Sequence, residues 1–501
     1  MRTKNAAYNS VSSLLLNIVT IIAGFILPRL ILSRFGSDYY GAVGTISQFI
    51  GFIGLLTAGV GGVTIAALFK PLAEQDTQKI SGIMRATESF MRKVALIFAG
   101  VLIIIAALYP LLITEEFDWF FVFSLTLILG SRTFVHHYFG ITYILLLSAN
   151  QRIYVLTLVQ VGTVILNTAV AALLILAGFD IRIVYLASAV LFAINPIFIY
   201  IYARKRYNID YSVSPDNIAL KQRWDAFAHQ VADFANANAP IFMITIFIGI
   251  LDVSVFVVYS LVIFAVRSFI VDLAGSGMSA GFGDMLAKKE DKKLQDGLRL
   301  YEFTIHTSAT LLLACTAILI VPFVSVFTLG VDDVDYYRPI FALLFCVAEF
   351  FNISRVPYQT IANVAGHFRQ TRNPAFIEIG ISVTISIVLV QWFGIIGVII
   401  GLLCGLIFRT VVFAIYVSRH LIVRSIWLFV RRVSVSLLIA TVIFLVSQFL
   451  PYMTDVTYWA WILFALPVFG VAIVITALFS MIFYREEIRM LISIIRHTIR
   501  G

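Results

Sequence analysis

Charged residues and cysteines are scarce in this chain of 501 residues. Asp, Glu, Lys and Arg make up 13% of it, whereas hydrophobic residues make up 61%. A soluble core needs far less apolar surface, so the composition excludes a soluble globular protein. The three cysteines, Cys315, Cys346 and Cys404, fall inside apolar runs without paired spacing, which indicates small buried side chains. We therefore expect no disulfide, no metal site and no cofactor.

Nucleotide-hydrolysis signals are missing as well. The sequence contains no G-x-x-x-x-G-K-[ST] phosphate loop, so we expect this chain not to hydrolyse ATP. The run that begins near Ser12 follows Arg2 and Lys4 and lacks a convincing small-residue cleavage site. We interpret it as a retained first helix rather than a removed signal peptide.

Apolar runs of about 20 residues recur along the whole chain, which predicts an all-α polytopic membrane protein. Division of the sequence at charged or turn-rich breaks gives about fourteen transmembrane helices. The predicted helices are 12–32, 41–68, 92–113, 119–147, 154–177, 183–203, 224–249, 252–275, 303–327, 337–364, 376–393, 395–418, 433–450 and 458–483.

Lysine and arginine alternate between the two sides of these helices. With the N-terminus in the cytoplasm, 28 of the 36 basic residues fall in inside segments and 4 fall outside. This asymmetry predicts that both termini are cytoplasmic. The net charge of +9 is then mostly a topology signal, with some attraction to anionic membrane lipids, and it does not indicate nucleic acid binding.

The sequence repeats itself at offsets of about 213 to 218 residues. "FGSDYYGAVG" is echoed by "IGILDVSVFVVYS", "YILLLSANQR" by "YQTIANVAGHFR", and "LVQVG" by "FIEIG". We infer two six-helix lobes that enter the membrane in the same direction around a central cavity, with a site at their interface. The predicted domains are the N-terminal lobe 1–207, a cytoplasmic linker 208–223, the C-terminal lobe 224–419, and two additional helices with a cytoplasmic tail in 420–501.

Four arginines lie within predicted helices, namely Arg132, Arg267, Arg355 and Arg409. A central intramembrane arginine costs about 2.5 to 3.5 kcal/mol, so we expect these side chains to face protein or a water-filled cavity. Arginine pairs with phosphate through two parallel hydrogen bonds and stays charged when dehydrated. The pattern favours a cavity that handles an anion. Arg409 could instead snorkel to the interface.

Arg132 and His136 are four residues apart and therefore share a helix face, which Gly140 continues without bulk. One interpretation is a polar wall that holds a phosphate-bearing headgroup, with His136 exchanging protons. The alternative is a hydrogen-bonded cluster that fixes helix packing.

Carboxylates also occur within predicted helices. Glu349, Asn352 and Arg355 step three residues at a time, Glu378 lies in the next helix, and Asp233 lies near "NANAP". A carboxylate in a membrane cavity is a candidate proton or sodium site, which makes Glu349, Glu378 and Asp233 candidates for ion coupling. Equally, such a carboxylate neutralises a nearby arginine. The charged segments 70–87 and 284–303 are interpreted as amphipathic helices on the cytoplasmic surface.

Taken together, "LPRLILSRFGSDYYGAVG", the echoed "AN" motifs and the paired six-helix halves resemble the polysaccharide transporter family. This family belongs to the multidrug/oligosaccharidyl-lipid/polysaccharide exporter superfamily. The resemblance implies a flippase that carries an undecaprenyl-pyrophosphate-linked oligosaccharide from the inner to the outer leaflet of the bacterial cytoplasmic membrane by alternating access. It implies association with polysaccharide assembly proteins. It also places Arg267 best, and Arg29, Arg132 and Arg355 next, in contact with the substrate.

Two other functions remain open. A cation-coupled multidrug exporter of the same superfamily would be expected to have intramembrane acids dominating its cavity. A membrane enzyme such as a glycan polymerase would be expected to have a large outside loop with clustered His, Asp or Arg, whereas the predicted outside loops are short. We therefore expect a transporter and not an enzyme.

Overall fold

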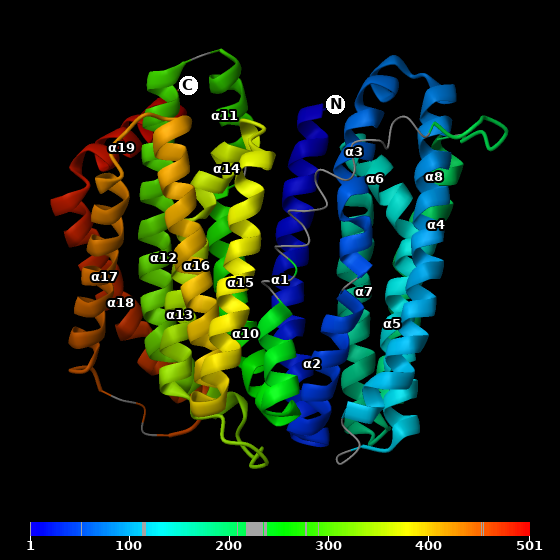
Figure 1. The fold of residues 1–501 in the computed structure, drawn as a ribbon, viewed down its shortest axis with the longest axis horizontal. Coiled ribbons are helices and arrows are strands. Elements are labelled where there is room, and N and C mark those ends of the chain that lie inside the picture. Colours follow the sequence, from blue (N-terminus) through cyan, green and yellow to red (C-terminus); the bar gives the residue numbers. More distant parts are fainter. Residues whose placement is uncertain are drawn as a thin grey trace. The chain divides into compact units, whose positions relative to one another are not determined.

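The computed structural model describes residues 2–51, 53–112, 117–207, 209–216, 234, 238–275, 278–288, 290–451, 453 and 455–500. Every regular element in these ranges is a helix, and 12 helices are long and apolar enough to cross a membrane (Figure 1). The predicted all-α polytopic membrane fold is confirmed. Of the about fourteen predicted helices, 41–68 is divided between two shorter helices, and half of 224–249 lies outside the described residues.

The chain divides into two compact units, Met1–Phe234 and Ala235–Gly501. The helices of the first unit are α1 (Arg2–Phe35), α2 (Ser37–Gly51), α3 (Ile53–Glu74), α4 (Thr77–Leu108), η1 (Tyr109–Leu112), α5 (Trp119–Val135), η2 (His136–Gly140), α6 (Ile141–Ala149), α7 (Tyr154–Leu176) and α8 (Ile181–Tyr207). Those of the second unit are Asn238–Phe247, α10 (Ile250–Gly275), α11 (Met278–Ala287), α12 (Asp291–Phe327), α13 (Pro339–Ser354), α14 (Val356–Val364), α15 (Phe368–Phe393), α16 (Ile395–His420), α17 (Trp427–Ser447), α18 (Tyr458–Phe483) and α19 (Arg485–Arg500).

Polar side chains set the starts of several long helices. Asp118 accepts hydrogen bonds from the backbone N–H groups of the first turn of α5, and Thr457 accepts one from Ala460 at the start of α18. Asp76 caps α4 in the same way, and the hydrogen bond from the Lys79 N–H lowers the pKa of its carboxyl. A cap of this kind stabilises a helix by about 1 kcal/mol.

The backbone itself carries the internal repeat. Left-handed backbone conformations, which favour glycine, occur at equivalent connections in both units. They follow α1 and Asn238–Phe247, they follow α6 and α14, and they precede α8 and α16. The matched positions are Gly36 and Gly249, Gln151 and Gly366, and Gly178 and Gly394, separated by 213, 215 and 216 residues. The fourth helix of each unit is also interrupted, by the π-helical turn η2 between α5 and α6 and by the break between α13 and α14.

In the first unit, the segment that follows α8 folds back onto α4. The backbone N–H of Asp210 donates to the hydroxyl of Ser81 at 3.0 Å, and the guanidinium of Arg85 donates to the carbonyl of Val213. The linker is therefore attached to the third helix of its own unit.

Glycines on α16 allow α15 to approach closely in the second unit. Gly397, Gly401 and Gly405 are spaced four residues apart and form one stripe, the small-residue pattern of membrane helix pairs. A Cβ on Gly401 would lie 2.6 Å from the carbonyl oxygen of Ser382, and one on Gly405 would lie 2.9 Å from that of Glu378. The stripe thus brings the backbone of α15 against α16 at the level of Glu378.

Gly401→Ala is expected to push α15 away from α16 and to destabilise the protein by about 1–3 kcal/mol, the usual range for overpacking. The readout is thermal melting of the purified protein in detergent. Gly380→Ala is the matched control, because a Cβ on Gly380 of α15 would meet no atom within 4 Å. Equal melting of the two variants would contradict the proposed contact.

Candidate functional site

A line of polar side chains crosses the second unit from a half-exposed position inwards. Arg267 on α10 is 45% exposed, and its Nη1 lies 3.8 Å from Oε2 of Glu349 on α13. One turn further, Asn352 donates from Nδ2 to the same oxygen at 3.1 Å and accepts at Oδ1 from Nη2 of Arg355 at 3.0 Å. These four side chains form a continuous chain of polar contacts.

The line ends in a buried cluster of two arginines and one glutamate. Glu378 on α15 accepts from Nη1 of Arg355 at 3.2 Å and from Nη1 of Arg409 on α16 at 2.7 Å. The side chains of Glu378 and Arg409 are 0% exposed. We call Arg267, Glu349, Asn352, Arg355, Glu378 and Arg409 the α10–α16 network. With every group ionised, its three arginines exceed its two glutamates by one positive charge.

The break in the fourth helix of this unit places Arg355. Pro357 lacks a backbone N–H and cannot continue the hydrogen-bond ladder to Ile353, so α13 ends at Ser354 and α14 begins at Val356. Thr410 on α16 donates its hydroxyl to the carbonyl of Phe351 at 2.9 Å, next to this break. Arg355 therefore sits at the joint between two helices, within reach of α15.

The structure brings together four of the eight predicted site residues, namely Arg267, Glu349, Arg355 and Glu378. The pairing interpretation of the carboxylates fits this geometry, because Glu349 faces Arg267 and Glu378 binds Arg355. The suggestion that Arg409 snorkels to the interface is wrong, since its side chain is fully buried against Glu378. Sequence reasoning missed this arginine as a member of the network.

In the first unit, Arg132 is an exposed residue of α5 whose guanidinium lies 3.6 Å from the centroid of the Phe192 ring. His136 follows one turn later, is half-buried, and begins the π-helical turn η2. Such turns often occur at functional sites. Gly140 closes the turn against α8, where a Cβ would lie 2.6 Å from the Cβ of Pro196.

The two remaining predicted site residues are less informative. Arg29 is a half-buried residue of α1, one position after Pro28. Asp233 lies outside the described residues.

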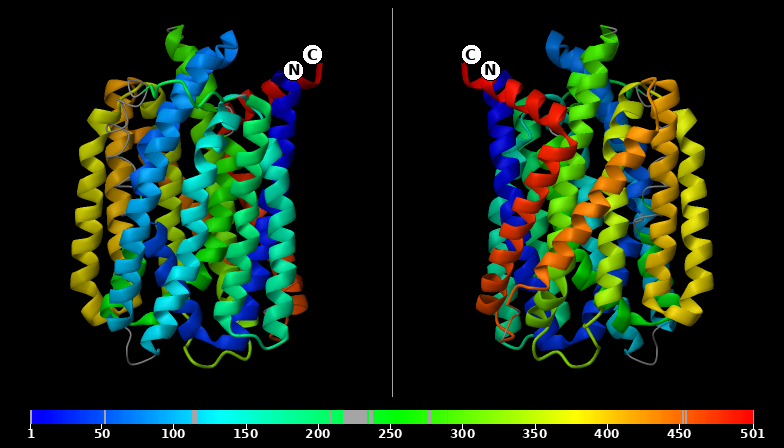
Figure 2. Two further views of the ribbon diagram at one scale, coloured as in Figure 1. Left: turned by 90° about the vertical axis from the view of Figure 1, so that its right-hand side faces the viewer. Right: turned by 90° about the vertical axis from the view of Figure 1, so that its left-hand side faces the viewer.

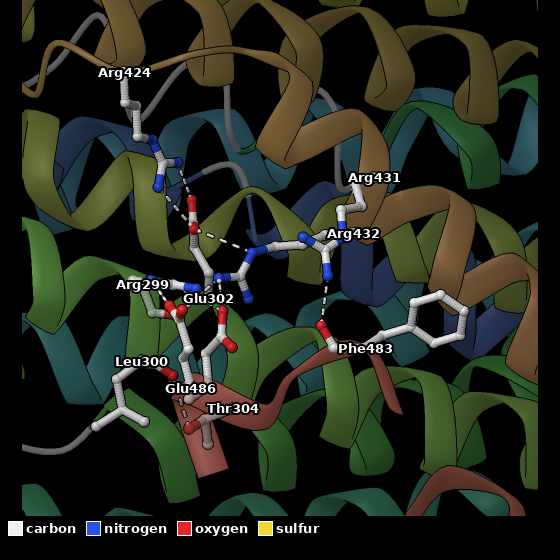
Figure 3. Close-up of polar contacts among 10 residues, drawn as sticks. Arg299, Leu300, Glu302, Thr304, Arg424, Arg431, Arg432, Phe483 and Glu486 are labelled. Carbon is white, nitrogen blue, oxygen red and sulfur yellow. Dashed lines mark hydrogen bonds and ion pairs between the residues drawn. The ribbon is translucent and has the colours of Figure 1, made fainter. Parts of the chain in front are cut away.

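A second charged cluster joins the end of the chain to α12, and Figure 3 shows its members. Glu302 on α12 is 0% exposed and accepts a hydrogen bond from Nη1 of Arg424 at 2.9 Å. The Nε of Arg432 on α17 lies 3.4 Å from Oε2 of the same carboxylate. Burial alone would lower the pKa of Arg424, but its hydrogen bond to Glu302 and the charge of that carboxylate raise it above the usual value.

The same cluster holds the first turn of α19. Glu487 accepts from Nε of Arg299 at 2.9 Å and from Nη2 of Arg432 at 3.3 Å, while Nη1 of Arg299 lies 2.6 Å from Oε2 of Glu486. We call Arg299, Glu302, Arg424, Arg432, Glu486 and Glu487 the C-terminal network. It joins α12, α17 and α19.

Sequence reasoning missed the C-terminal network because 284–303 was interpreted as a surface helix. That interpretation is wrong for its last part: residues 291–303 continue into the long helix α12, and Glu302 is buried. One signal was available. Glu88 and Arg85 on α4 precede Glu302 and Arg299 by 214 residues, so both halves carry the same Arg-x-x-Glu pattern.

No protein-family model matches the sequence, and no curated protein matches it. Solved structures do match the fold. The lipid II flippase MurJ, in an inward closed conformation, aligns with a TM-score of 0.69 and 15% identity, over 96% of this chain and 99% of MurJ. An inward-facing multidrug resistance MATE family transporter of the MOP superfamily aligns with a TM-score of 0.59 and 15% identity, over 79% of this chain and 93% of the transporter.

A MOP superfamily transporter from Pyrococcus furiosus, reported to have a binding pocket of reverse polarity, aligns with a TM-score of 0.58 and 14% identity, over 82% of this chain and 94% of that one. At such low identity the likeness concerns the fold. The resemblance inferred from the sequence is confirmed at that level: the chain has the fold shared by the MurJ flippase and the MATE transporters of the MOP superfamily.

Proposed function

We propose that this chain is a flippase that moves an undecaprenyl-pyrophosphate-linked oligosaccharide from the inner to the outer leaflet of the bacterial cytoplasmic membrane. Its product would supply a surface polysaccharide such as O-antigen, capsule or exopolysaccharide. The observation that carries the proposal is the 45% exposed guanidinium of Arg267, which lies within a helix long and apolar enough to span the membrane. Guanidinium groups match the oxygens of a pyrophosphate in two-point hydrogen bonds.

Arg267 is the member of the network that would meet the substrate first. It is 45% exposed, whereas Arg355 is 9% exposed and Arg409 is 0% exposed. Its contact with Glu349, at 3.8 Å, is also longer than the contacts of Arg355 and Arg409 with Glu378. A phosphate would therefore exchange with Glu349 at Arg267 and leave the buried cluster intact.

The likeness to MurJ supports a lipid-linked substrate. The MurJ structure covers 96% of this chain. The residues left uncovered are fewer than the residues of α17 and α18 together, so the likeness extends into this last helix pair. The MATE transporter covers 79% of the chain. The likeness to the lipid flippase therefore extends over more of this chain than the likeness to the MATE transporter.

A cation-coupled multidrug exporter is the alternative, and the likeness to MATE transporters favours it. The described charges of the α10–α16 network argue against a cationic substrate, because each of its two glutamates already faces an arginine. These glutamates fit ion coupling better. Glu349 is the stronger candidate for binding H⁺ or Na⁺, because its arginine is displaced more readily than those of Glu378.

The proposed cycle moves its substrate without a covalent step, so we propose a transporter and not an enzyme. Both termini are proposed to be cytoplasmic, in line with the lysine and arginine distribution. The partners would be the lipid-linked oligosaccharide, membrane lipids and polysaccharide assembly proteins.

Arg267→Gln is expected to reduce export of the surface polysaccharide about 10- to 100-fold at unchanged membrane abundance, because a hydrogen bond to a charged group contributes about 1.5–3 kcal/mol. Arg267→Lys should retain an intermediate rate, since lysine keeps the charge but loses the planar fork. The readouts are surface glycan and the lipid-linked intermediate that accumulates in the inner leaflet.

Arg338→Gln is the matched control for this experiment. Arg338 is a partly exposed arginine of the same unit that faces Asp335 and Asp252, outside the α10–α16 network. Normal export by Arg267→Gln would remove the proposed role of this residue. Increased sensitivity to cationic drugs, without any accumulated lipid intermediate, would favour the multidrug exporter.

A further inference from the structure

The roll of α19 about its own axis is fixed by the C-terminal network. Glu487, in the first turn, is 4% exposed and is held by Arg299 and Arg432. One side of α19 therefore faces α12 and α17, as Figure 3 shows. This contact sets the direction in which Arg489, Leu491 and Ile492 point.

Two arginines fall on the opposite side of the helix and form what we call the basic stripe. At about 100° per residue, Arg485 and Arg489 lie about 40° apart, and their midpoint is about 180° from Glu487. Arg485 and Arg489 are exposed. Both glutamates of the helix are already engaged by the C-terminal network, so this basic stripe has no acidic residue of α19 within it.

An apolar flank lies between Glu487 and the basic stripe. The same helical register places Ile488, Leu491 and Ile492 within an arc of about 100°. Ile488 packs against the hydrophobic cluster of the second unit, whereas Leu491 and Ile492 are 37% and 43% exposed. The apolar flank therefore begins on the protein and continues beyond it.

The position of α19 in the chain puts this flank at the edge of the membrane. Only Tyr484 separates it from α18, a helix long and apolar enough to span the bilayer, and the chain turns sharply between the two (Figure 2). A helix with an apolar flank beside a basic stripe, at the end of a membrane span, matches the interfacial helices that bind anionic lipid.

We propose that α19 lies flat in the headgroup layer and binds anionic phospholipids through Arg485 and Arg489. Its apolar flank enters the boundary between headgroups and acyl chains, and its basic stripe points sideways at phosphate height. The C-terminal network holds it in this orientation. The occupant of this face is the bilayer itself, because the apolar flank and the basic stripe both adjoin the end of a membrane span.

Hydrogen exchange tests the proposal on the full-length protein reconstituted in nanodiscs of phosphatidylcholine, with and without phosphatidylglycerol. The amides of α19 are expected to exchange at least about tenfold more slowly when the anionic lipid is present, since each arginine near such a surface adds to the binding free energy. Exchange in α12 serves as the internal reference and should not change.

Arg485→Gln/Arg489→Gln should reduce this lipid dependence several-fold. Lys292→Gln/Lys293→Gln removes two exposed charges from α12 and should not alter it. Identical exchange of wild-type α19 in the two lipids would overturn the proposal, and this comparison requires no variant to fold. Full lipid dependence in the double arginine variant would overturn the role of the basic stripe.

Discussion

Glu378→Gln is expected to destabilise the protein by about 3–5 kcal/mol, the usual cost of leaving a buried charge without its partner. Glutamine keeps the shape of the side chain but removes the charge that two guanidinium groups share. Arg409, at 0% exposure, cannot reach water when that charge is lost. The melting temperature of the detergent-purified protein should fall accordingly, as measured by the loss of the monodisperse peak on heating.

Glu349→Gln is the matched control for this prediction. Glu349 is itself 4% exposed, but its arginine partner is 45% exposed and 3.8 Å away. The arginine therefore still reaches water when Glu349 loses its charge, and the change should cost about 1 kcal/mol or less. This variant should affect transport more than stability, whereas Glu378→Gln should do the reverse. Equal melting temperatures for the two glutamine variants would contradict the assigned difference between the open and the buried end of the α10–α16 network.

A double-mutant cycle separates the ion pair from other effects. Glu378→Leu combined with Arg409→Leu removes both charges of the shortest contact, which is 2.7 Å. The double variant should be more stable than the sum of the two single changes predicts. Glu378→Leu alone leaves the buried Arg409 without this carboxylate, whereas the double variant removes that guanidinium as well. Simple additivity would show that the two residues act independently.

The helices of this protein were largely predictable because hydrophobicity alone defines a membrane span. The predicted helix 458–483 matches α18, and 395–418 lies within α16. The predicted helix 41–68 was wrong in one respect, since the structure divides this apolar stretch into α2 and α3. Hydrophobicity does not report a break between two apolar helices.

The charge pairs were less predictable because each joins distant parts of the chain. Arg409 lies 31 residues from Glu378, and Arg424 lies 122 residues from Glu302. The sequence indicates that an intramembrane arginine needs a partner but not which carboxylate supplies it. A buried residue near the charged end of a helix, such as Glu302, is also easily assigned to the surface because its neighbours in the sequence are polar.

The internal repeat explains why the C-terminal network forms where it does. In the first unit, the segment after α8 returns to α4, where Arg85 binds the carbonyl of Val213. In the second unit, the segment after α16 returns to the equivalent part of α12, where Arg424 binds Glu302. The third long helix of each unit therefore binds the segment that leaves its sixth helix. In the first unit this segment is the linker, and in the second it leads into the α17–α18 pair.

Glu302→Gln is consequently expected to release the end of the chain from the second unit. Arg424 and Arg432 are each 4% exposed and would lose the carboxylate that they share, at a cost of about 3–5 kcal/mol. Arg432 would still contact Glu487, whereas Arg424 would lose its carboxylate. The segment around Arg424, just before α17, should therefore detach first. Limited proteolysis should then cleave the segment between α16 and α17 much faster than in the wild type.

Glu88→Gln is the control that the repeat provides. Glu88 occupies the equivalent position on α4, but its partner Arg92 is 39% exposed and lies on the same helix, so the change should cost about 1 kcal/mol or less. Cleavage between α16 and α17 should stay at the wild-type rate in this variant. If Glu302→Gln also left that rate unchanged, Glu302 would not be what holds the α17–α18 pair, and packing against α12 would have to account for its attachment.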